Sequence, residues 1–277
     1  MKQHTLKTSL DFTGVGLHTG RPVTMRLSPA PVDFGVRFNR TDLGAGASLP
    51  ALAAYVGQSR RSTALEYKGV KVITPEHLLS ALSGMGVDNA LVDLDAPEVP
   101  ILDGSAKPYV EAIQEAGLVE QDLERDVLVV ERPFVYEDRR SDSRITIEPW
   151  DSTVFDVTID FNSRVVGVQR ACFDTADDYA REIAPCRTFC FLHEIELLQK
   201  FGLIKGGSLD NALVIDEPKG YLAGQVPFFD NELARHKLLD LMGDFSLLGR
   251  PFRGKVTAWK PGHKVNTQAI KKFLETL

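Results

Sequence analysis

Hydrophobic and polar residues alternate in short runs over the first 60 residues, which is typical of half-buried strands joined by turns. The run Val23–Leu27 is one example, and it follows the glycine-rich segment Thr13–Gly20, where three glycines indicate a turn or a close approach of backbone. No G-x-G-x-x-G motif leads from a strand into a helix. The pattern therefore gives little support to a dinucleotide-binding fold.

A helix–strand–helix series follows this strand-rich region. A helix with an apolar face is predicted to begin near Pro75, a residue suited to the first helical position, with Thr74 as its N-cap. Residues 89–94 are predicted to form a buried strand, and residues 105–116 a second helix.

The acidic run at residues 120–126 has no hydrophobic periodicity, and it is the best candidate for a linker. Beyond it, the pattern predicts strands over 127–130, 144–147, 154–161, 213–215 and 255–259, and helices over 177–183, 194–201, 230–248 and 265–276. Both halves thus end in the order helix, strand, helix. We therefore expect two similar α+β domains, comprising residues 1–124 and 125–277.

Composition and charge narrow the class of protein. The 277 residues carry a formal net charge of -6, which argues against a nucleic-acid partner but leaves room for a small anionic ligand. Three cysteines, an odd and sparse count, do not suit a disulfide scaffold. The N-terminus lacks the apolar core of a signal peptide, and no run reaches the roughly 20 apolar residues of a membrane helix. We expect a cytoplasmic protein without a transmembrane segment.

The strongest chemical signal lies in the long helix predicted over 230–248. His236 and Asp240 are four residues apart, so they share one helix face, and Asp244 extends that face by another turn. An imidazole and a carboxylate at this spacing can bind one metal ion. The alternative is a surface His–Asp pair, which contributes only a few tenths of a kcal/mol.

Glu76 and His77 form a second signal at the start of a predicted helix. Hydrolytic zinc sites place a glutamate beside a metal-binding histidine, so that the carboxylate can deprotonate a water molecule. Taken alone, the Glu76-His77 dipeptide favours the alternative, in which Glu76 is an acidic residue that stabilises a helix N-terminus. With His236 and Asp240, His77 would complete three ligands and leave a fourth position for water, as in catalytic zinc sites.

His263 provides a third signal in a Gly/Pro turn after the last predicted strand. Asp244 could orient this histidine and keep it charged, which would suit a general acid. An ordinary solvated loop histidine is the alternative.

Several short motifs occur in an order that closely resembles the UDP-3-O-acyl-N-acetylglucosamine deacetylase family. They are TGVGLHTG (Thr13–Gly20), Glu76-His77, PILDGSAKP (Pro100–Pro108), Arg187-Thr188-Phe189, Gly206-Gly207-Ser208, HKLLDLMGD (His236–Asp244) and Gly262-His263. The resemblance extends over nearly the whole chain. It implies two domains, each a β-sheet layered on a pair of helices, with the active site between them. It also implies insertions near residues 40–60 and 187–217.

The resemblance assigns roles to the candidate residues. His77, His236 and Asp240 match the metal ligands, Glu76 the general base and His263 the general acid. A second set would contact the substrate or the acid: Thr188 the oxyanion, Asp244 the His263 ring, Lys237 and Lys260 the diphosphate or the leaving sugar, Phe161 the uracil, and Phe189 the acyl chain.

The resemblance also implies an activity. The chain would hydrolyse the N-acetyl group of a UDP-linked acylated sugar in a Zn²⁺-dependent reaction, with Fe²⁺ as a second possible metal. That reaction is the committed step of lipid A biosynthesis in Gram-negative bacteria. We expect a monomer. The alternatives are a zinc deacetylase of another N-acetyl sugar and a non-catalytic module that binds a sugar nucleotide.

Overall fold

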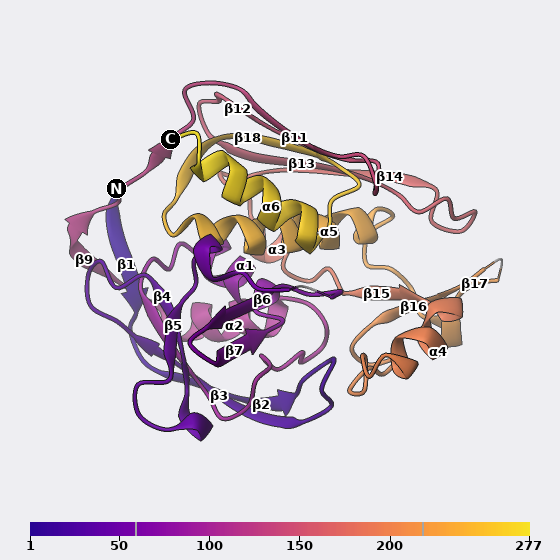
Figure 1. Ribbon diagram of the computed structural model, residues 1–277, viewed down its shortest axis with the longest axis horizontal. Coiled ribbons are helices and arrows are strands. Elements are labelled where there is room, and N and C mark those ends of the chain that lie inside the picture. The colour runs from indigo at the N-terminus through magenta and orange to yellow at the C-terminus, as the bar shows by residue number, and fades with distance from the viewer. Residues whose placement is uncertain (59, 218) are drawn as a thin grey trace.

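A computed structural model describes residues 1–58, 60–217 and 219–277. These residues form six α-helices and several sheets (Figure 1), and the predicted α+β class is confirmed. The helices are α1 (Glu76–Gly84), α2 (Lys107–Ala116), α3 (Tyr179–Glu182), α4 (Leu192–Lys200), α5 (Glu232–Phe245) and α6 (His263–Leu274). Each corresponds to a predicted helix with its ends shifted by a few residues.

The two largest sheets have the same strand order. The first runs β2 (Leu10–Val15), β3 (Pro22–Pro29), β8 (Ala90–Leu94), β4 (Val36–Arg40) and β5 (Ser48–Pro50). The second runs β11 (Phe134–Asp138), β12 (Ser143–Glu148), β18 (Phe252–Trp259), β13 (Thr153–Asp160) and β14 (Val168–Asp174), with β10 (Leu128–Val129) also paired to β18.

In each sheet the last strand in sequence, β8 or β18, occupies the centre. Each central strand pairs parallel to one neighbour, β4 or β13, and antiparallel to the other, β3 or β12. A helix precedes and a helix follows each central strand. The expected similarity of the two halves is therefore present in their topology, although the boundary at residue 124 stays a prediction.

Helices α1, α2, α5 and α6 lie between the two sheets. In Figure 1 the first half is indigo to magenta and the second half runs from magenta-pink through orange to yellow, and α1 and α5 meet near the middle. The contacts agree with this view: α5 packs on α1 and on β13 and β14, while α6 packs on β11 and β12. Helix α5 is buried along nearly its whole length. A helix surrounded in this way holds its polar side chains away from bulk water.

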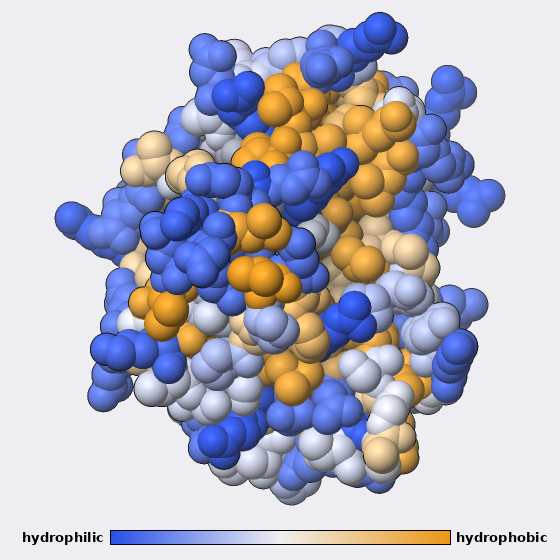
Figure 2. Space-filling view, turned by 90° about the vertical axis from the view of Figure 1, so that its left-hand side faces the viewer, coloured by the Kyte–Doolittle hydropathy of each residue, from blue (hydrophilic) through white to orange (hydrophobic). Residues whose placement is uncertain are grey.

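The acidic run at residues 120–126 was wrongly predicted to be a linker. Residues Leu118–Glu124 form strand β9, which pairs antiparallel with β1 (Lys2–Leu6). Most β9 side chains are exposed, so the strand shows no buried-face periodicity, and charged residues are common on such edge strands. Figure 2 shows the side of the molecule on which β9 lies, with hydrophobic residues gathered in the upper part and hydrophilic residues around them.

Each half carries an additional element before its inner helix. In the first half this element is the hairpin of β6 (Ala64–Tyr67) and β7 (Val70–Ile73), which precedes α1. The resemblance placed the insertion near residues 40–60 instead. Strand β5, in that range, belongs to the main sheet. In the second half, the expected insertion near 187–217 contains α4 and a small sheet of β15 (Phe189–Phe191), β16 (Leu213–Asp216) and β17 (Gly220–Tyr221). This second insertion projects from the body at the right of Figure 1.

Among the described residues, no helix combines the length and apolar character that crossing a membrane requires.

Candidate metal centre and catalytic residues

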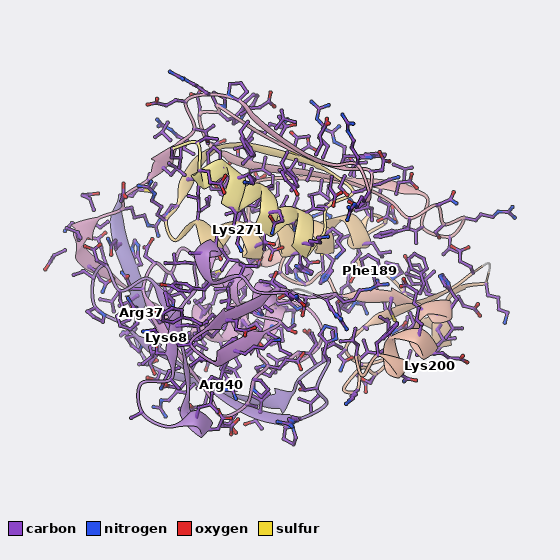
Figure 3. The ribbon with its side chains drawn as sticks, in the orientation of Figure 1. Arg37, Arg40, Lys68, Phe189, Lys200 and Lys271 are labelled. Atoms are coloured by element: carbon purple, nitrogen blue, oxygen red, sulfur yellow. The ribbon has the colours of Figure 1, made fainter. Side chains whose placement is uncertain are left out.

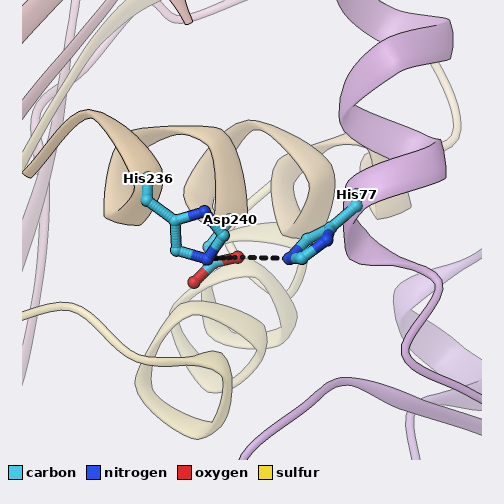
Figure 4. A group of neighbouring side chains, drawn as sticks. All are labelled: His77, His236 and Asp240. Carbon is cyan, nitrogen blue, oxygen red and sulfur yellow. Dashed lines mark ion pairs between the residues drawn. The ribbon is translucent and has the colours of Figure 1, made fainter. Parts of the chain in front are cut away.

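Helices α1 and α5 bring three potential metal ligands together (Figure 4). His77 lies in the first turn of α1, while His236 and Asp240 lie one turn apart on α5. The Oδ1 atom of Asp240 is 3.5 Å from the Nε2 atom of His77 and 3.5 Å from the Nε2 atom of His236. One donor atom from each residue lies within 4.8 Å of the others. The i, i+4 spacing therefore supplied two neighbours, and helix packing brought the third.

A glycine makes this close helix packing possible. A Cβ atom at Gly243 on α5 would lie 2.0 Å from the carbonyl oxygen of Glu76 at the start of α1, far too close for any side chain. The absence of a side chain at Gly243 lets the first turn of α1, with Glu76 and His77, approach the face of α5 that carries Asp240.

The donor set fits a divalent metal ion. Donors at tetrahedral angles, about 2.0–2.1 Å from Zn²⁺, are separated by about 3.3–3.4 Å, close to the two distances at Asp240. Asp240 Oδ1 has no hydrogen-bond partner among the described residues, although it is buried. A buried carboxylate oxygen without a donor is costly unless another group compensates it, and a cation between the two rings would do so.

The surroundings of two of the candidate ligands, His236 and Asp240, favour the protonation states that bind a cation. The Nδ1 atom of His236 lies 3.0 Å from the carbonyl oxygen of Cys186, which leaves Nε2 to bind a metal. Burial lowers the pKa of His236 to about 3, so its ring is neutral at physiological pH. Burial alone would raise the pKa of Asp240, but the positive charge of Lys237, whose Nζ atom lies 2.7 Å from Oδ2 of Asp240, holds it well below its usual range.

Glu76 occupies the first position of α1 and is buried beside the ligands. Its Oε2 atom accepts a hydrogen bond of 3.2 Å from the backbone N–H of Thr63, and its Oε1 atom lies 3.5 Å from Nε2 of His263. Burial raises the pKa of Glu76 to about 7. A carboxylate with that pKa can accept and release a proton near neutral pH.

Thr74 does not cap this helix, which corrects the prediction. Pro75 is the N-cap residue, and no side chain makes a capping hydrogen bond. Thr74 has a positive φ of 58°, and its hydroxyl donates to Oε1 of the buried Glu98 instead. Glu98 also accepts hydrogen bonds from the backbone N–H groups of His18 and Thr19, so it connects the glycine-rich segment to the start of α1.

His263 was predicted to lie in a Gly/Pro turn. It is instead the first residue of α6, which corrects that prediction. Its Nδ1 atom lies 3.0 Å from Oδ2 of Asp244. Burial alone would lower the pKa of His263, but Asp244, Glu76 and Asp240 raise it to about 9. The ring is therefore protonated at neutral pH and can donate a proton through Nε2.

The segment before β15 lies against α5. Besides the Cys186–His236 contact, Arg187 forms a two-pronged ion pair with Glu232, with N···O distances of 2.9 and 3.0 Å. Thr188 follows, held by backbone hydrogen bonds to Gly104 and from Leu213, both of 2.8 Å. These contacts fix the backbone of Thr188 two residues beyond the Cys186 carbonyl, which contacts the candidate ligand His236.

Three of the four predicted substrate contacts lie near this segment. The Phe189 ring is 6.1 Å from the His236 ring and 5.5 Å from the Phe161 ring, and Lys237 Nζ is 5.8 Å from its centroid. Figure 3 places Phe189 where the chain leaves the body for the second insertion. The fourth, Lys260, is engaged with two carboxylates, Asp142 at 3.2 Å and Asp160 at 3.3 Å.

Sequence reasoning missed three buried polar residues of the site: Thr63, Glu232 and Asn266. Glu232 had a visible signal, because it lies four residues before His236 and begins the polar stripe that continues through Asp240 and Asp244. Thr63 and Asn266 carried no such spacing, since tertiary packing alone brings them to Asp244.

Comparison with known proteins gives a consistent result. Residues 3–275 match the family described as UDP-3-O-acyl N-acetylglycosamine deacetylase. The UDP-3-O-acyl-N-acetylglucosamine deacetylase of Myxococcus xanthus is 44% identical, over 98% of this chain and 86% of the relative. The protein of the same description from Syntrophotalea carbinolica is 45% identical, over 98% of this chain and 87% of the relative. The one from Pseudomonas entomophila is 43% identical, over 99% of this chain and 90% of the relative.

Proposed function

Because the chain belongs to the UDP-3-O-acyl N-acetylglycosamine deacetylase family, we propose that it hydrolyses the N-acetyl group of UDP-3-O-acyl-N-acetylglucosamine. The products are acetate and the free 2-amino sugar nucleotide. As implied by the family, this is the deacetylation step of lipid A biosynthesis. The observation that carries the proposal in the structure is the convergence of His77, His236 and Asp240 beside the buried Glu76.

His77, His236 and Asp240 would hold a divalent metal ion, which we propose is Zn²⁺, with Fe²⁺ as the second candidate. When bound, such an ion acts as a Lewis acid that makes a carbonyl easier to attack and a water molecule easier to deprotonate. Three protein ligands leave the open coordination position that a catalytic site needs.

Glu76 would remove the proton from the attacking water. Its pKa of about 7 provides an ionised fraction near neutral pH, and it lies beside the metal ligands in a site shielded from bulk water. The hydroxyl of Thr188 would donate a hydrogen bond to the carbonyl oxygen as negative charge develops there. Loss of one such donor typically costs about 3 kcal/mol of transition-state stabilisation.

His263 would donate a proton to the departing amine. An amide nitrogen is a poor leaving group until it is protonated, and a histidine whose pKa is about 9 carries the required proton. Asp244 would keep the ring charged and aimed, because its Oδ2 atom lies 3.0 Å from Nδ1 and leaves Nε2 directed toward Glu76.

The remaining substrate contacts are those that the family resemblance implies, and three of the four residues lie around Phe189. Lys237 and Lys260 would bind the diphosphate or the sugar, Phe161 would stack near the uracil, and Phe189 would line the path of the acyl chain. Because the chain is acidic overall, local cations must bind the diphosphate. The cytoplasmic location and the monomeric state stay predictions.

One assay tests the proposal. Purified protein is given UDP-3-O-acyl-N-acetylglucosamine, and acetate release is measured before chelation, after chelation, and after Zn²⁺ or Fe²⁺ is restored. We expect release to disappear with the metal and to return with it. Equal rates on UDP-N-acetylglucosamine would favour a deacetylase of another sugar. Binding without any acetate release would favour a non-catalytic module.

A further inference from the structure

Thr63 contacts both members of the proposed acid–base pair. It directly precedes β6 and is completely buried. Its backbone N–H donates to Oε2 of Glu76 at 3.2 Å. Its hydroxyl donates to Oδ1 of Asp244 and lies 3.3 Å from Nδ1 of His263.

These contacts close a ring of four residues. Glu76 Oε1 faces His263 Nε2 at 3.5 Å, and His263 Nδ1 faces Asp244 Oδ2 at 3.0 Å. Thr63 completes the ring, because its hydroxyl contacts Asp244 and its backbone N–H contacts Glu76. Two members come from each half of the chain, so the ring also spans the junction between α1 and the pair of helices α5 and α6.

The backbone of Thr63 is fixed independently of its hydroxyl. Its carbonyl oxygen accepts a hydrogen bond of 2.9 Å from the N–H of Thr74, two residues before Glu76. Thr74 is in turn held by the buried Glu98. The first half of the chain therefore anchors Thr63, and its hydroxyl acts on a residue of the second half.

The hydroxyl also determines how the Asp244 oxygens are used. Oδ2 receives the His263 ring at 3.0 Å and the amide of Asn266 at 2.8 Å, while Oδ1 receives Thr63. Asp244 is fully buried, so an oxygen left without a donor would compete for the remaining ones. Occupying Oδ1 keeps Oδ2 available to orient His263.

We propose that Thr63 is a positioning residue that aligns His263 through Asp244 while holding the Glu76 carboxylate in place. This inference rests on the proposed function. A wild-type protein that releases no acetate contradicts that function, whereas the variants below test Thr63 only in an active enzyme.

The test compares Thr63→Val with Thr63→Ser. Valine keeps the shape and the backbone N–H but removes the hydroxyl, and serine restores it. We expect Thr63→Val to lower kcat by about 10- to 100-fold, since a hydrogen bond to a charged group is lost, with KM and bound metal nearly unchanged. Thr63→Ser should retain most of kcat. Equal kcat values for the valine variant and the wild type would overturn the inference.

Two controls separate positioning from a purely structural role. Thr5→Val removes another buried hydroxyl of the first half, which donates to the Asn89 carbonyl, so it should lower the melting temperature without lowering kcat. In the second control, Thr63→Val is combined with Asp244→Asn. We expect Thr63→Val to lower kcat much less in the Asp244→Asn background than in the wild type, because both substitutions disturb the same contact between Thr63 and Asp244. The same fold-loss in both backgrounds would contradict action through Asp244.

Discussion

The Nε2 atom of His263 lies 3.5 Å from the Oε1 atom of Glu76, although the two residues begin different helices in different halves of the chain. A carboxylate and an imidazole at this distance influence each other's protonation. Burial raises the pKa of Glu76 to about 7, while neighbouring carboxylates overcome burial to raise the pKa of His263 to about 9. The order of the two pKa values suits a base and an acid that act together.

This order predicts a bell-shaped dependence of kcat/KM on pH. Glu76 is an effective base only when ionised, so the rate should rise through about pH 7. His263 is an effective acid only when protonated, so the rate should fall through about pH 9. Initial rates across this range check the prediction, and a flat profile would contradict it. The two apparent values belong to the coupled pair.

Replacing either Glu76 or His263 should slow turnover strongly without removing the metal. We expect Glu76→Gln and His263→Ala each to lower kcat by about 10²- to 10⁴-fold, the usual contribution of general acid–base catalysis. Elemental analysis should find wild-type metal content in both. Wild-type turnover in either variant would remove that residue from the mechanism.

Replacing a proposed metal ligand should lower the metal content as well as the activity. His236→Ala or Asp240→Ala leaves only two of the three donors, so bound metal should fall in elemental analysis and activity with it. His4→Ala is a matched control, because His4 lies in β1 and outside the donor group. Unchanged metal stoichiometry in the ligand variants would refute this ligand set.

The Arg187–Glu232 pair predicts a stability effect. Glu232 is completely buried and binds both arms of Arg187 as well as the N–H of Phe228. Because Glu232→Ala leaves a largely buried guanidinium without its partner, we expect a loss of about 3–5 kcal/mol in urea unfolding.

The exposed pair Lys272–Glu275 provides the comparison for this measurement, since breaking a solvated pair should change the unfolding free energy little. Arg187→Met combined with Glu232→Leu should recover part of the loss, because no buried charge then remains unpaired. A Glu232→Ala protein as stable as the wild type would show that the pair is not structural.

The periodicity of the sequence predicted the helices well because the signal is local. An apolar face recurs at helical spacing whatever the helix packs against, and the same rule placed His236 and Asp240 on one face. Strand β9 was not predicted, because backbone hydrogen bonds to β1 hold it in place while most of its side chains face water. The sequence therefore shows no alternation of apolar and polar residues there. Thr74 matched a capping residue in type, but Glu98, distant in sequence, takes its hydroxyl.

The sequence by itself determined the helices, the α+β class, the polar stripe on α5 and, through its motifs, the family. Only the tertiary structure decided that His77 meets that stripe, that His263 faces Glu76, and that Thr63 joins Glu76 to Asp244. The reason is physical: spacing along a helix fixes neighbours within a few residues, whereas contacts between helices depend on packing and on close approaches such as that at Gly243. The pKa values of Glu76 and His263 depend on burial and neighbouring charges, which exist only once both halves have folded together.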